Sequence, residues 1–215
     1  MDRFKNDKRK IKNFKNIILP YTNKIAGVDE VGRGCLAGPV FAAAVILNRN
    51  INTKGIIDSK KIPFKKRIIL SRYIKKNSTY AIGYATVSEI NKINILNASL
   101  LSMKRALSKL KYKPAVAYID GIFAPKNIKI KYKTFIKGDE KITSIAAASI
   151  VAKAARDLFM IKLSKKFPKY NWDQNFGYGT KKHLKSLNKY GVTKYHRKKF
   201  KPVHNILMCR TRETQ

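Results

Sequence analysis

Cysteine and long apolar runs are both scarce in this chain. The two cysteines, Cys35 and Cys209, lie far apart without CxxC spacing. This excludes a disulfide framework or a zinc cluster and is typical of a reducing compartment. No stretch approaches the ~20 apolar residues needed to span a bilayer, and the run at 17–20 is too short for the core of a signal peptide. We therefore expect a cytoplasmic protein without a membrane segment.

Acidic residues are also scarce, because 12 Asp and Glu stand against 48 Lys and Arg and give a formal net charge of +36. A strongly cationic surface favours a polyanionic partner, since binding releases phosphate counterions. The same excess of lysine is expected from an AT-rich genome. The lysines are not confined to one segment, so composition does not locate a binding surface.

The chain nevertheless has ample material for a folded core, with 44% hydrophobic residues in 215. This length predicts one domain with small appendages. We interpret residues 1–23 as a basic N-terminal arm, residues 24–205 as the folded domain and residues 206–215 as a tail.

Apolar periodicity predicts an alternating arrangement of strands and helices. Five β-type runs lie at 25–31, 40–47, 80–87, 115–119 and 132–136. Helical spacing of apolar residues occurs at 64–76, 95–110 and 143–165, and the segment from 167 is helical and rich in loops. Two adjacent strands followed by alternating helices and strands indicate an α/β sheet with helices on its faces.

Three of the few acids lie in or at the end of apolar strand segments. Asp29 and Glu30 follow the run at 25–28, and Asp120 follows the run at 115–119. Burial of an ionised carboxylate is costly without a partner, and neighbouring carboxylates repel one another. A divalent cation such as Mg²⁺ would remove both costs, whereas pairing with abundant lysine and arginine is the structural alternative. Successive strand side chains point to opposite faces, so Glu30 would need a bulge, a strand end or its backbone to join Asp29.

Two further acids have simpler interpretations from the residues alone. Asp139 lies in a turn before the helix at 143–165, where a surface or helix-entry charge is the favoured interpretation. Asp157 lies four residues after Lys153 on the same helix, and we expect the two to form an ion pair.

The segment Gly27-Val-Asp-Glu-Val-Gly-Arg-Gly-Cys-Leu-Ala-Gly-Pro-Val40 resembles the opening signature of type 2 ribonuclease H, the bacterial ribonuclease HII family. Further matches follow in the family's order. They are Asp58-Ser-Lys-Lys61 with Lys66-Arg67, Tyr118-Ile-Asp-Gly121, Lys137-Gly-Asp139, Ser144-Ile-Ala-Ala-Ala-Ser-Ile-Val-Ala-Lys153 with Arg156-Asp157, Gly177-Tyr-Gly-Thr180, and His196-Arg197 with Phe200 and Pro202-Val203. They span roughly residues 25 to 205.

This resemblance implies a ribonuclease H-like fold, with a mixed β-sheet flanked by helices and a C-terminal helical extension. It implies four catalytic, metal-binding acids, which are Asp29, Glu30, Asp120 and Asp139, and so it overrides the structural interpretation of Asp139. The cofactor would be Mn²⁺ or Mg²⁺. In a two-metal site the ions lie ~3.5–4 Å apart, one activating water and one stabilising the leaving oxygen, and products would have 5′-phosphate and 3′-hydroxyl ends.

The same resemblance assigns substrate binding to Gly32, Arg33, Gly34 and Tyr178. The main chain of the tripeptide would sense the ribose 2′-hydroxyl, which distinguishes RNA from DNA, and Tyr178 would stack on the sugar 3′ to the ribonucleotide. Without the family, the glycines would be interpreted as shaping a turn and Tyr178 as an ordinary tyrosine. The implied partners are RNA–DNA hybrid and duplex DNA that contains ribonucleotides, as in ribonucleotide excision repair.

Departures from the family pattern are few. Cys35 stands where many relatives have proline, and its thiol is a candidate for oxidation near the site. No recognisable partner-binding motif occurs at 210–215, and we expect a monomer. Two alternative functions share part of the evidence. A non-catalytic RNA-binding protein would explain the charge, and another polynucleotidyl transferase of ribonuclease H-like fold would explain the carboxylates.

Overall fold

A mixed five-stranded sheet forms the centre of the molecule. The structure is a computed structural model that describes residues 25–212, so the predicted N-terminal arm lies outside the described residues. The strands are β1 (Ile25–Val31), β2 (Val40–Leu47), β3 (Ser78–Ala85), β4 (Val116–Asp120) and β5 (Lys131–Phe135). They lie in the order β3-β2-β1-β4-β5, with β1, β2 and β3 antiparallel and β1, β4 and β5 parallel.

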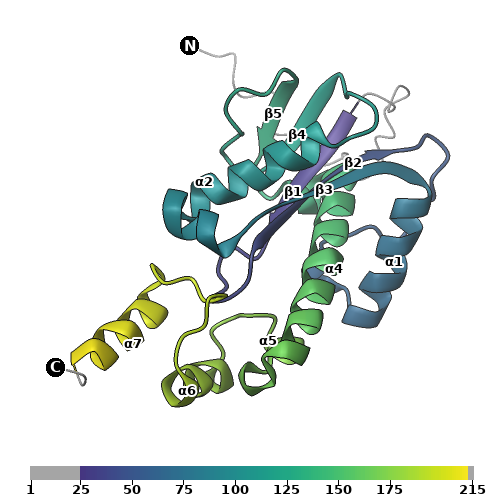
Figure 1. The fold of residues 1–215 in the computed structure, drawn as a ribbon. Helices are drawn as coiled ribbons and strands as arrows, with labels where there is room; N and C mark the ends of the chain where they lie inside the picture. The colour runs from purple at the N-terminus through teal and green to yellow at the C-terminus, as the bar shows by residue number, and fades with distance from the viewer. Residues whose placement is uncertain (1–24, 213–215) are drawn as a thin grey trace, which may run out of the picture.

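Helices cover both faces of this sheet (Figure 1). The helix α4 (Thr143–Lys166) packs on β1 and β2 on one face, with α1 (Phe64–Lys76) beside it. The helix α2 (Val87–Ser108) packs on β2 and β3 on the other face. Runs of alanine in α4 allow its backbone to approach the sheet closely, and these alanines are buried with Val45 and Ile74 in one core cluster. A second core cluster joins α2 to Val28 and Ile119.

The predicted third strand ends two residues earlier than expected, because α2 begins at Val87. Thr86 and Glu89 form a reciprocal capping box, in which the Thr86 side chain accepts from the Glu89 N–H and the Glu89 carboxylate accepts from the Thr86 N–H. Asn94 then has φ 67°, so two helical segments meet at a kink there. The predicted helix at 95–110 is therefore only the second part of a longer one.

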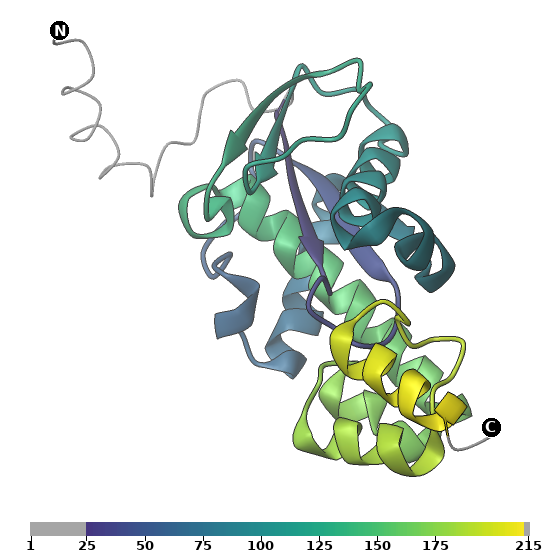
Figure 2. The ribbon, with the colours of Figure 1, turned by 90° about the vertical axis from the view of Figure 1, so that its left-hand side faces the viewer.

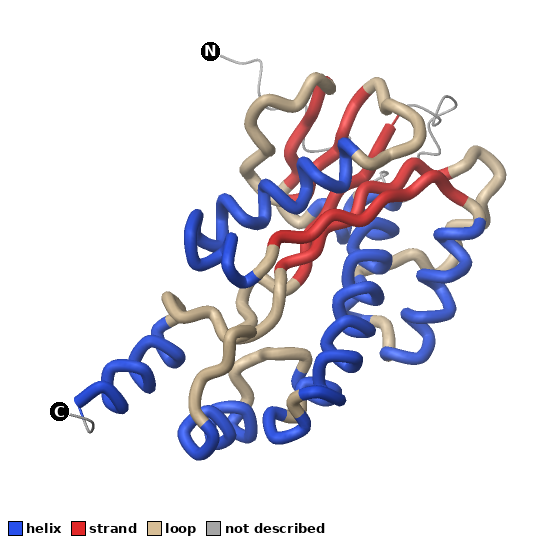
Figure 3. The backbone as a smooth tube through the Cα atoms, viewed as in Figure 1, coloured by secondary structure: helices blue, strands red, loops and turns tan. Residues whose placement is uncertain are grey.

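Shorter helices follow α4 and gather at one end of the molecule (Figures 2 and 3). They are α5 (Trp172–Asn175), α6 (Lys181–Tyr190) and α7 (Lys201–Arg212). One further short helix, α3 (Gly138–Lys141), lies between β5 and α4. A core cluster that includes Trp172, Leu187 and Val203 joins these helices to Leu36 and Met160. Among residues 25–212, no helix is long and apolar enough to cross a membrane.

Candidate active site

The ends of two neighbouring parallel strands bring Asp29 and Asp120 together. The register of β1 and β4 pairs Val28 with Ile119, so Asp29 and Asp120 occupy the next positions on adjacent strands. Neighbouring residues at one register position project from the same face of a sheet. Val28 and Ile119 belong to the α2 side of the core, and the two acids therefore project from the opposite face, toward α4.

A tight turn after β5 brings Asp139 to the same place. Lys137 has a left-handed backbone conformation with φ 54°, and α3 begins directly after it. The Gly138 N–H donates to Asp120 Oδ1 at 2.7 Å, which ties this turn to the end of β4. Asp139 is buried, at 7% exposure. Of its two local interpretations, a surface charge is wrong because Asp139 is buried, whereas a helix-entry charge is correct because Asp139 lies in the first turn of α3. The burial depends on a contact between distant segments, which a local pattern does not reveal.

Glu30 adjoins this cluster, but strand alternation directs its side chain to the opposite face of β1. β1 pairs with β2 without interruption through Val31, so no bulge turns Glu30 toward the face of Asp29. Its carboxylate Oε1 instead lies 3.2 Å from Arg33 Nη1. The pKa of Glu30 is raised, mainly by burial, although Arg33 opposes the rise.

The acids have the two costs that their sequence positions predict, which are burial and mutual repulsion. Burial raises the pKa of Asp29 well above its usual value, and the charges of Glu30, Asp120 and Asp139 raise it further. Burial likewise raises the pKa of Asp120, with a contribution from Asp139, against hydrogen bonds from backbone N–H groups that lower it. A positive charge placed between these carboxylates would relieve their repulsion.

Lys60 supplies part of that positive charge. Its Nζ lies 3.6 Å from Asp139 Oδ2 at the end of a long, exposed side chain. Burial lowers the pKa of Lys60, but the charges of Asp139, Asp58 and Asp29 outweigh this effect and raise it. Lys60 belongs to a segment that matches the family, but its sequence position assigns it no role, and only the fold shows that it reaches the acids.

The carboxylate oxygens are the type of ligand that a divalent cation prefers, although each carboxylate already has a hydrogen-bond or ion-pair partner in the protein. Asp29 Oδ1 accepts from the Glu30 N–H at 2.7 Å, while Asp120, Asp139 and Glu30 have the partners described above. Within residues 25–212, no three acidic, histidine or cysteine side chains are already gathered as metal ligands. The set consists of oxygen donors, which Mg²⁺ and Mn²⁺ prefer, and a bound ion would replace the neighbouring ammonium of Lys60.

The loop of residues 32–34, here called the Gly-Arg-Gly loop, follows the acids directly. Gly32 has φ 93°, and a Cβ there would collide with the Arg156 side chain, so the position requires glycine. A Cβ at Gly34 would meet no atom within 4 Å. The packing of the protein therefore explains the glycine at position 32, and at Gly34 it leaves open space beside the loop.

Two buried arginines from distant segments hold this loop and residues 37–39, which lead from it into β2. Arg197 donates to the carbonyl oxygens of Gly32 at 2.6 Å and Arg33 at 2.8 Å, and to that of Gly38 at 3.0 Å. Arg156 donates to the carbonyl of Pro39 at 3.0 Å and to that of Ala37 at 3.1 Å. The sequence placed both arginines in family motifs but could not assign these contacts, which span more than a hundred residues.

Tyr178 lies near the same loop with 39% of its surface exposed. Burial of its hydroxyl and the neighbouring Cys35 thiol raise the pKa of Tyr178 to about 12, so the phenol stays protonated at neutral pH. The ammonium of Lys153 lies 5.5 Å from the ring centroid and the guanidinium of Arg156 6.0 Å from it. Cys35 itself is fully buried, and this arrangement leaves an aromatic surface partly open beside cationic groups.

A model of the ribonuclease HII family matches residues 26–203. The chain belongs to the ribonuclease HII family. Over 185 residues it is 60% identical to the ribonuclease HII of Pelagibacter ubique (strain HTCC1062), covering 85% of this chain and 98% of that protein. Over 182 residues it is 52% identical to the ribonuclease HII of Wolbachia sp. subsp. Brugia malayi, covering 84% of this chain and 89% of the relative.

Solved structures of the same class share the fold. The ribonuclease H2 of Pyrococcus horikoshii OT3 superposes with a TM-score of 0.73 at 26% identity, covering 88% of this chain and 99% of that one. Bst-RNase HIII in complex with Mn²⁺ also superposes with a TM-score of 0.73, at 19% identity, covering 89% of this chain and 71% of that one. The expected ribonuclease H-like fold, with a mixed sheet flanked by helices and a C-terminal helical extension, is confirmed. As a member of this family, the chain is a nuclease of the ribonuclease H class, a hydrolase.

The ion pair expected for Asp157 in this ribonuclease HII is confirmed, with a second partner. Lys153 Nζ lies 2.8 Å from Asp157 Oδ1, and Arg67 Nη2 lies 2.9 Å from Asp157 Oδ2. Asp157 is fully buried. It joins α1 to α4 beneath the site and is a structural residue, as its sequence position predicted.

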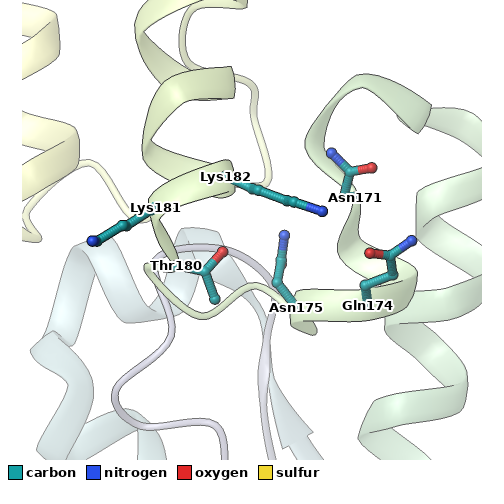
Figure 4. A pocket seen from close by; sticks show the side chains of 6 residues that line it. All are labelled: Asn171, Gln174, Asn175, Thr180, Lys181 and Lys182. Atoms are coloured by element: carbon teal, nitrogen blue, oxygen red, sulfur yellow. The ribbon is translucent and has the colours of Figure 1, made fainter.

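A polar pocket lies where α5 and α6 meet (Figure 4). It has a volume of about 280 Å³ and is lined by Asn171, Gln174, Asn175, Thr180, Lys181 and Lys182. The Lys182 side chain extends over the pocket toward Asn171, whereas Lys181 points away from it (Figure 4). The chain therefore presents cationic groups at this pocket as well as beside the acids.

Proposed function

We propose that this ribonuclease HII hydrolyses the RNA strand of RNA–DNA hybrids and cuts 5′ to ribonucleotides embedded in duplex DNA. The observation that carries the proposal is the meeting of Asp29, Asp120 and Asp139 from three separate elements in a chain with a net charge of +36. So basic a protein has no structural need to gather three mutually repelling carboxylates, of which Asp29 and Asp139 are buried and Asp120 is half-buried. A phosphodiesterase site that holds cations and binds a polyanion needs both features.

The residues proposed to hold Mn²⁺ or Mg²⁺ are Asp29, Glu30, Asp120 and Asp139. Because the Glu30 side chain lies on the other face of β1, its backbone carbonyl is the atom available to the cluster. When bound, two such ions would activate water and stabilise the leaving 3′ oxygen, giving 5′-phosphate and 3′-hydroxyl products. The Mn²⁺ complex of the structurally similar Bst-RNase HIII supports the choice of ion.

Recognition of the ribonucleotide is assigned to the Gly-Arg-Gly loop and to Tyr178. The open space beside Gly34 allows a sugar to approach the main chain, whose N–H and carbonyl groups can hydrogen-bond to a 2′-hydroxyl. The exposed part of the Tyr178 ring can stack on the sugar that follows. Because the hydroxyl stays protonated, Tyr178 has no negative charge to repel the phosphates of the substrate.

In this proposal the protein acts as a monomer in the cytoplasm, during the removal of ribonucleotides from DNA. Both cysteines are free, which fits a reducing compartment.

A cleavage assay tests the proposal directly. The protein is incubated with Mn²⁺ or Mg²⁺ and with end-labelled duplexes that contain no ribonucleotide, one ribonucleotide, or a continuous RNA strand. We expect a single cut 5′ to the lone ribonucleotide, many cuts in the RNA strand and no cut in all-DNA duplex. Cleavage of all-DNA duplex would instead favour another polynucleotidyl transferase of the same fold, and binding without cleavage under all conditions would favour a non-catalytic RNA-binding protein.

A further inference from the structure

Side chains from residues 183–197 hydrogen-bond to main-chain carbonyls of both elements that are proposed to recognise the ribonucleotide. Arg197 holds the Gly-Arg-Gly loop through the carbonyls of Gly32 and Arg33. His183 Nδ1 lies 2.8 Å from the carbonyl oxygen of Tyr178. His196, which directly precedes Arg197, lies with its Nε2 at 3.1 Å from His183 Nε2. All three side chains are fully buried.

Two obligatory donors fix the direction of every hydrogen bond in this chain of residues. The indole N–H of Trp172 can only donate, and it donates to His183 Nε2 at 3.0 Å. His183 therefore has its proton on Nδ1, which donates to the Tyr178 carbonyl. The backbone N–H of Thr193 donates to His196 Nδ1 at 3.0 Å, so His196 has its proton on Nε2. This N–H faces His183 Nε2, whose single lone pair it shares with the Trp172 indole.

Both histidines remain neutral, as these hydrogen-bond directions require. Burial lowers the pKa of His183. Burial and the neighbouring His183 lower the pKa of His196 to about 3. Arg197 keeps its charge at neutral pH even though burial lowers its pKa to about 9. Two neutral histidines in contact thus link the Tyr178 carbonyl to Arg197, the residue after His196, and Arg197 binds the loop carbonyls.

We propose that His183, His196 and Arg197, here called the brace, set the spacing between Tyr178 and the Gly-Arg-Gly loop and thereby determine how strictly the enzyme requires a ribonucleotide. The proposal rests on the proposed function, in which those two elements contact the substrate. The brace residues are positioning residues, because they act through the main chain of the elements that they hold.

The chemistry of each brace residue suits positioning better than general stability. A buried cation whose hydrogen bonds go to carbonyl oxygens and not to a carboxylate, like those of Arg197, has a large desolvation cost that an apolar side chain would avoid. The planar guanidinium donates in three fixed directions, so it holds three carbonyls in one geometry, which the single flexible ammonium of lysine cannot do. Small displacements of substrate-positioning groups lower catalytic rates strongly.

The test compares the parent protein with the variants Arg197→Lys and His183→Gln. Arg197→Lys keeps the charge and loses the geometry of the loop contacts. His183→Gln keeps a polar group near the position of Nε2 and loses the Nδ1 donor to Tyr178. Ser164→Ala is the matched control, since it removes a buried hydrogen bond to Asp173 in the same C-terminal region without touching either element.

The measured quantity is kcat/KM on a single-ribonucleotide duplex divided by kcat/KM on a long RNA–DNA hybrid. A loss of folded enzyme scales both values equally and leaves the ratio unchanged, so a merely structural role would not move it. On a long hybrid many registers present a 2′-hydroxyl, and misplacement matters less. We expect the ratio to fall about tenfold in both brace variants, mainly through kcat, and to stay within about twofold of the parent in the control.

A ratio that stays within about twofold of the parent in either brace variant would overturn the brace, and so would an equal fall in Ser164→Ala. If one brace variant yields no folded protein by circular dichroism, the other decides the question. Parent protein that cuts neither ribonucleotide substrate would overturn the proposed function and the brace with it. Parent cleavage with unchanged ratios in the variants would overturn the brace alone.

Discussion

At the scale of single residues, the acids of the site influence one another's ionisation, because each carboxylate lies in the field of its neighbours. Asp29 is buried among carboxylates that raise its pKa, and the neighbouring ammonium of Lys60 compensates only part of this repulsion. Their value to the protein therefore lies in what they bind. Each carboxylate should matter to activity far more than to folding, which distinguishes them from the structural acid Asp157.

Replacement of one central carboxylate should remove most cleavage. We expect Asp29→Asn and Asp120→Asn each to lower the rate roughly 10³-fold, because a lost metal ligand forfeits several kcal/mol of transition-state stabilisation. Glu140→Gln is the matched control, since it neutralises an exposed acid adjacent to Asp139. Rates are measured on a long hybrid with excess Mn²⁺, and near-parent cleavage by either Asp variant would exclude that residue from the site.

Metal should stabilise the protein, and pH should govern the effect. The pKa of Asp29 is raised in the folded state, so its contribution to stability is present below its unfolded pKa of about 3.9 and is lost as pH rises through the folded value. The metal-free protein should therefore lose stability over that window. At neutral pH, Mn²⁺ at about a hundred times its Kd should raise stability by about 2.7 kcal/mol.

Thermal unfolding followed by circular dichroism measures both effects. The Asp29→Asn variant should unfold at a higher temperature than the parent without metal, since the substitution removes a repelling charge at almost constant shape. It should also lose most of the Mn²⁺-dependent increase in Tm. An equal Mn²⁺ response in parent and variant would show that the ion binds elsewhere.

The aromatic ring of Tyr178 should matter most where only one ribonucleotide is present. Tyr178→Ala removes a proposed stacking contact worth ~1–3 kcal/mol by analogy with base–aromatic stacking. Activity on a single-ribonucleotide duplex should therefore fall more than activity on a long hybrid. Equal losses on the two substrates, measured as kcat/KM, would refute the role of Tyr178 at the junction.

At the scale of elements, the Gly-Arg-Gly loop offers two neighbouring glycines with different constraints. Gly32→Ala should destabilise the fold, because φ is 93° there and the new Cβ would collide with Arg156. Gly34→Val should leave the thermal stability near that of the parent, since open space surrounds the position. It should still impair cleavage of both ribonucleotide substrates by blocking the approach of the sugar. Normal cleavage by a folded Gly34→Val protein would remove the loop from the binding surface.

The elements of the sheet could be predicted from the sequence to within about two residues, because buried strands are short apolar runs. The start of α2 could not, since the capping pair Thr86 and Glu89 begins a helix inside a segment that is still apolar. In the site, burial of Asp139 and the reach of Lys60 depend on contacts between distant segments. Local patterns do not contain such contacts, and only the family resemblance predicted a site role for Asp139.

At the scale of the whole molecule, the charge of +36 should be visible in binding. The logarithm of the affinity for hybrid should fall linearly with the logarithm of salt concentration, with a slope of about −0.9 per phosphate neutralised. Fluorescence anisotropy with a labelled hybrid in Ca²⁺ or without metal measures this slope without cleavage. A flat response would show that the excess of lysine reflects composition alone, and it would leave the active site untouched.

The hydrogen bond from Arg197 to Gly32 joins residues 165 positions apart in the chain. Synthesis on the ribosome proceeds from the N-terminus, so the strand that bears Asp29 leaves the ribosome long before the residue that holds its neighbouring loop. Contacts of such high sequence separation form late and slow the folding of a domain. If the loop reads the ribose as proposed, we expect a nascent chain to assemble the carboxylates before it can discriminate a ribose, and to acquire selectivity only when the last segment docks.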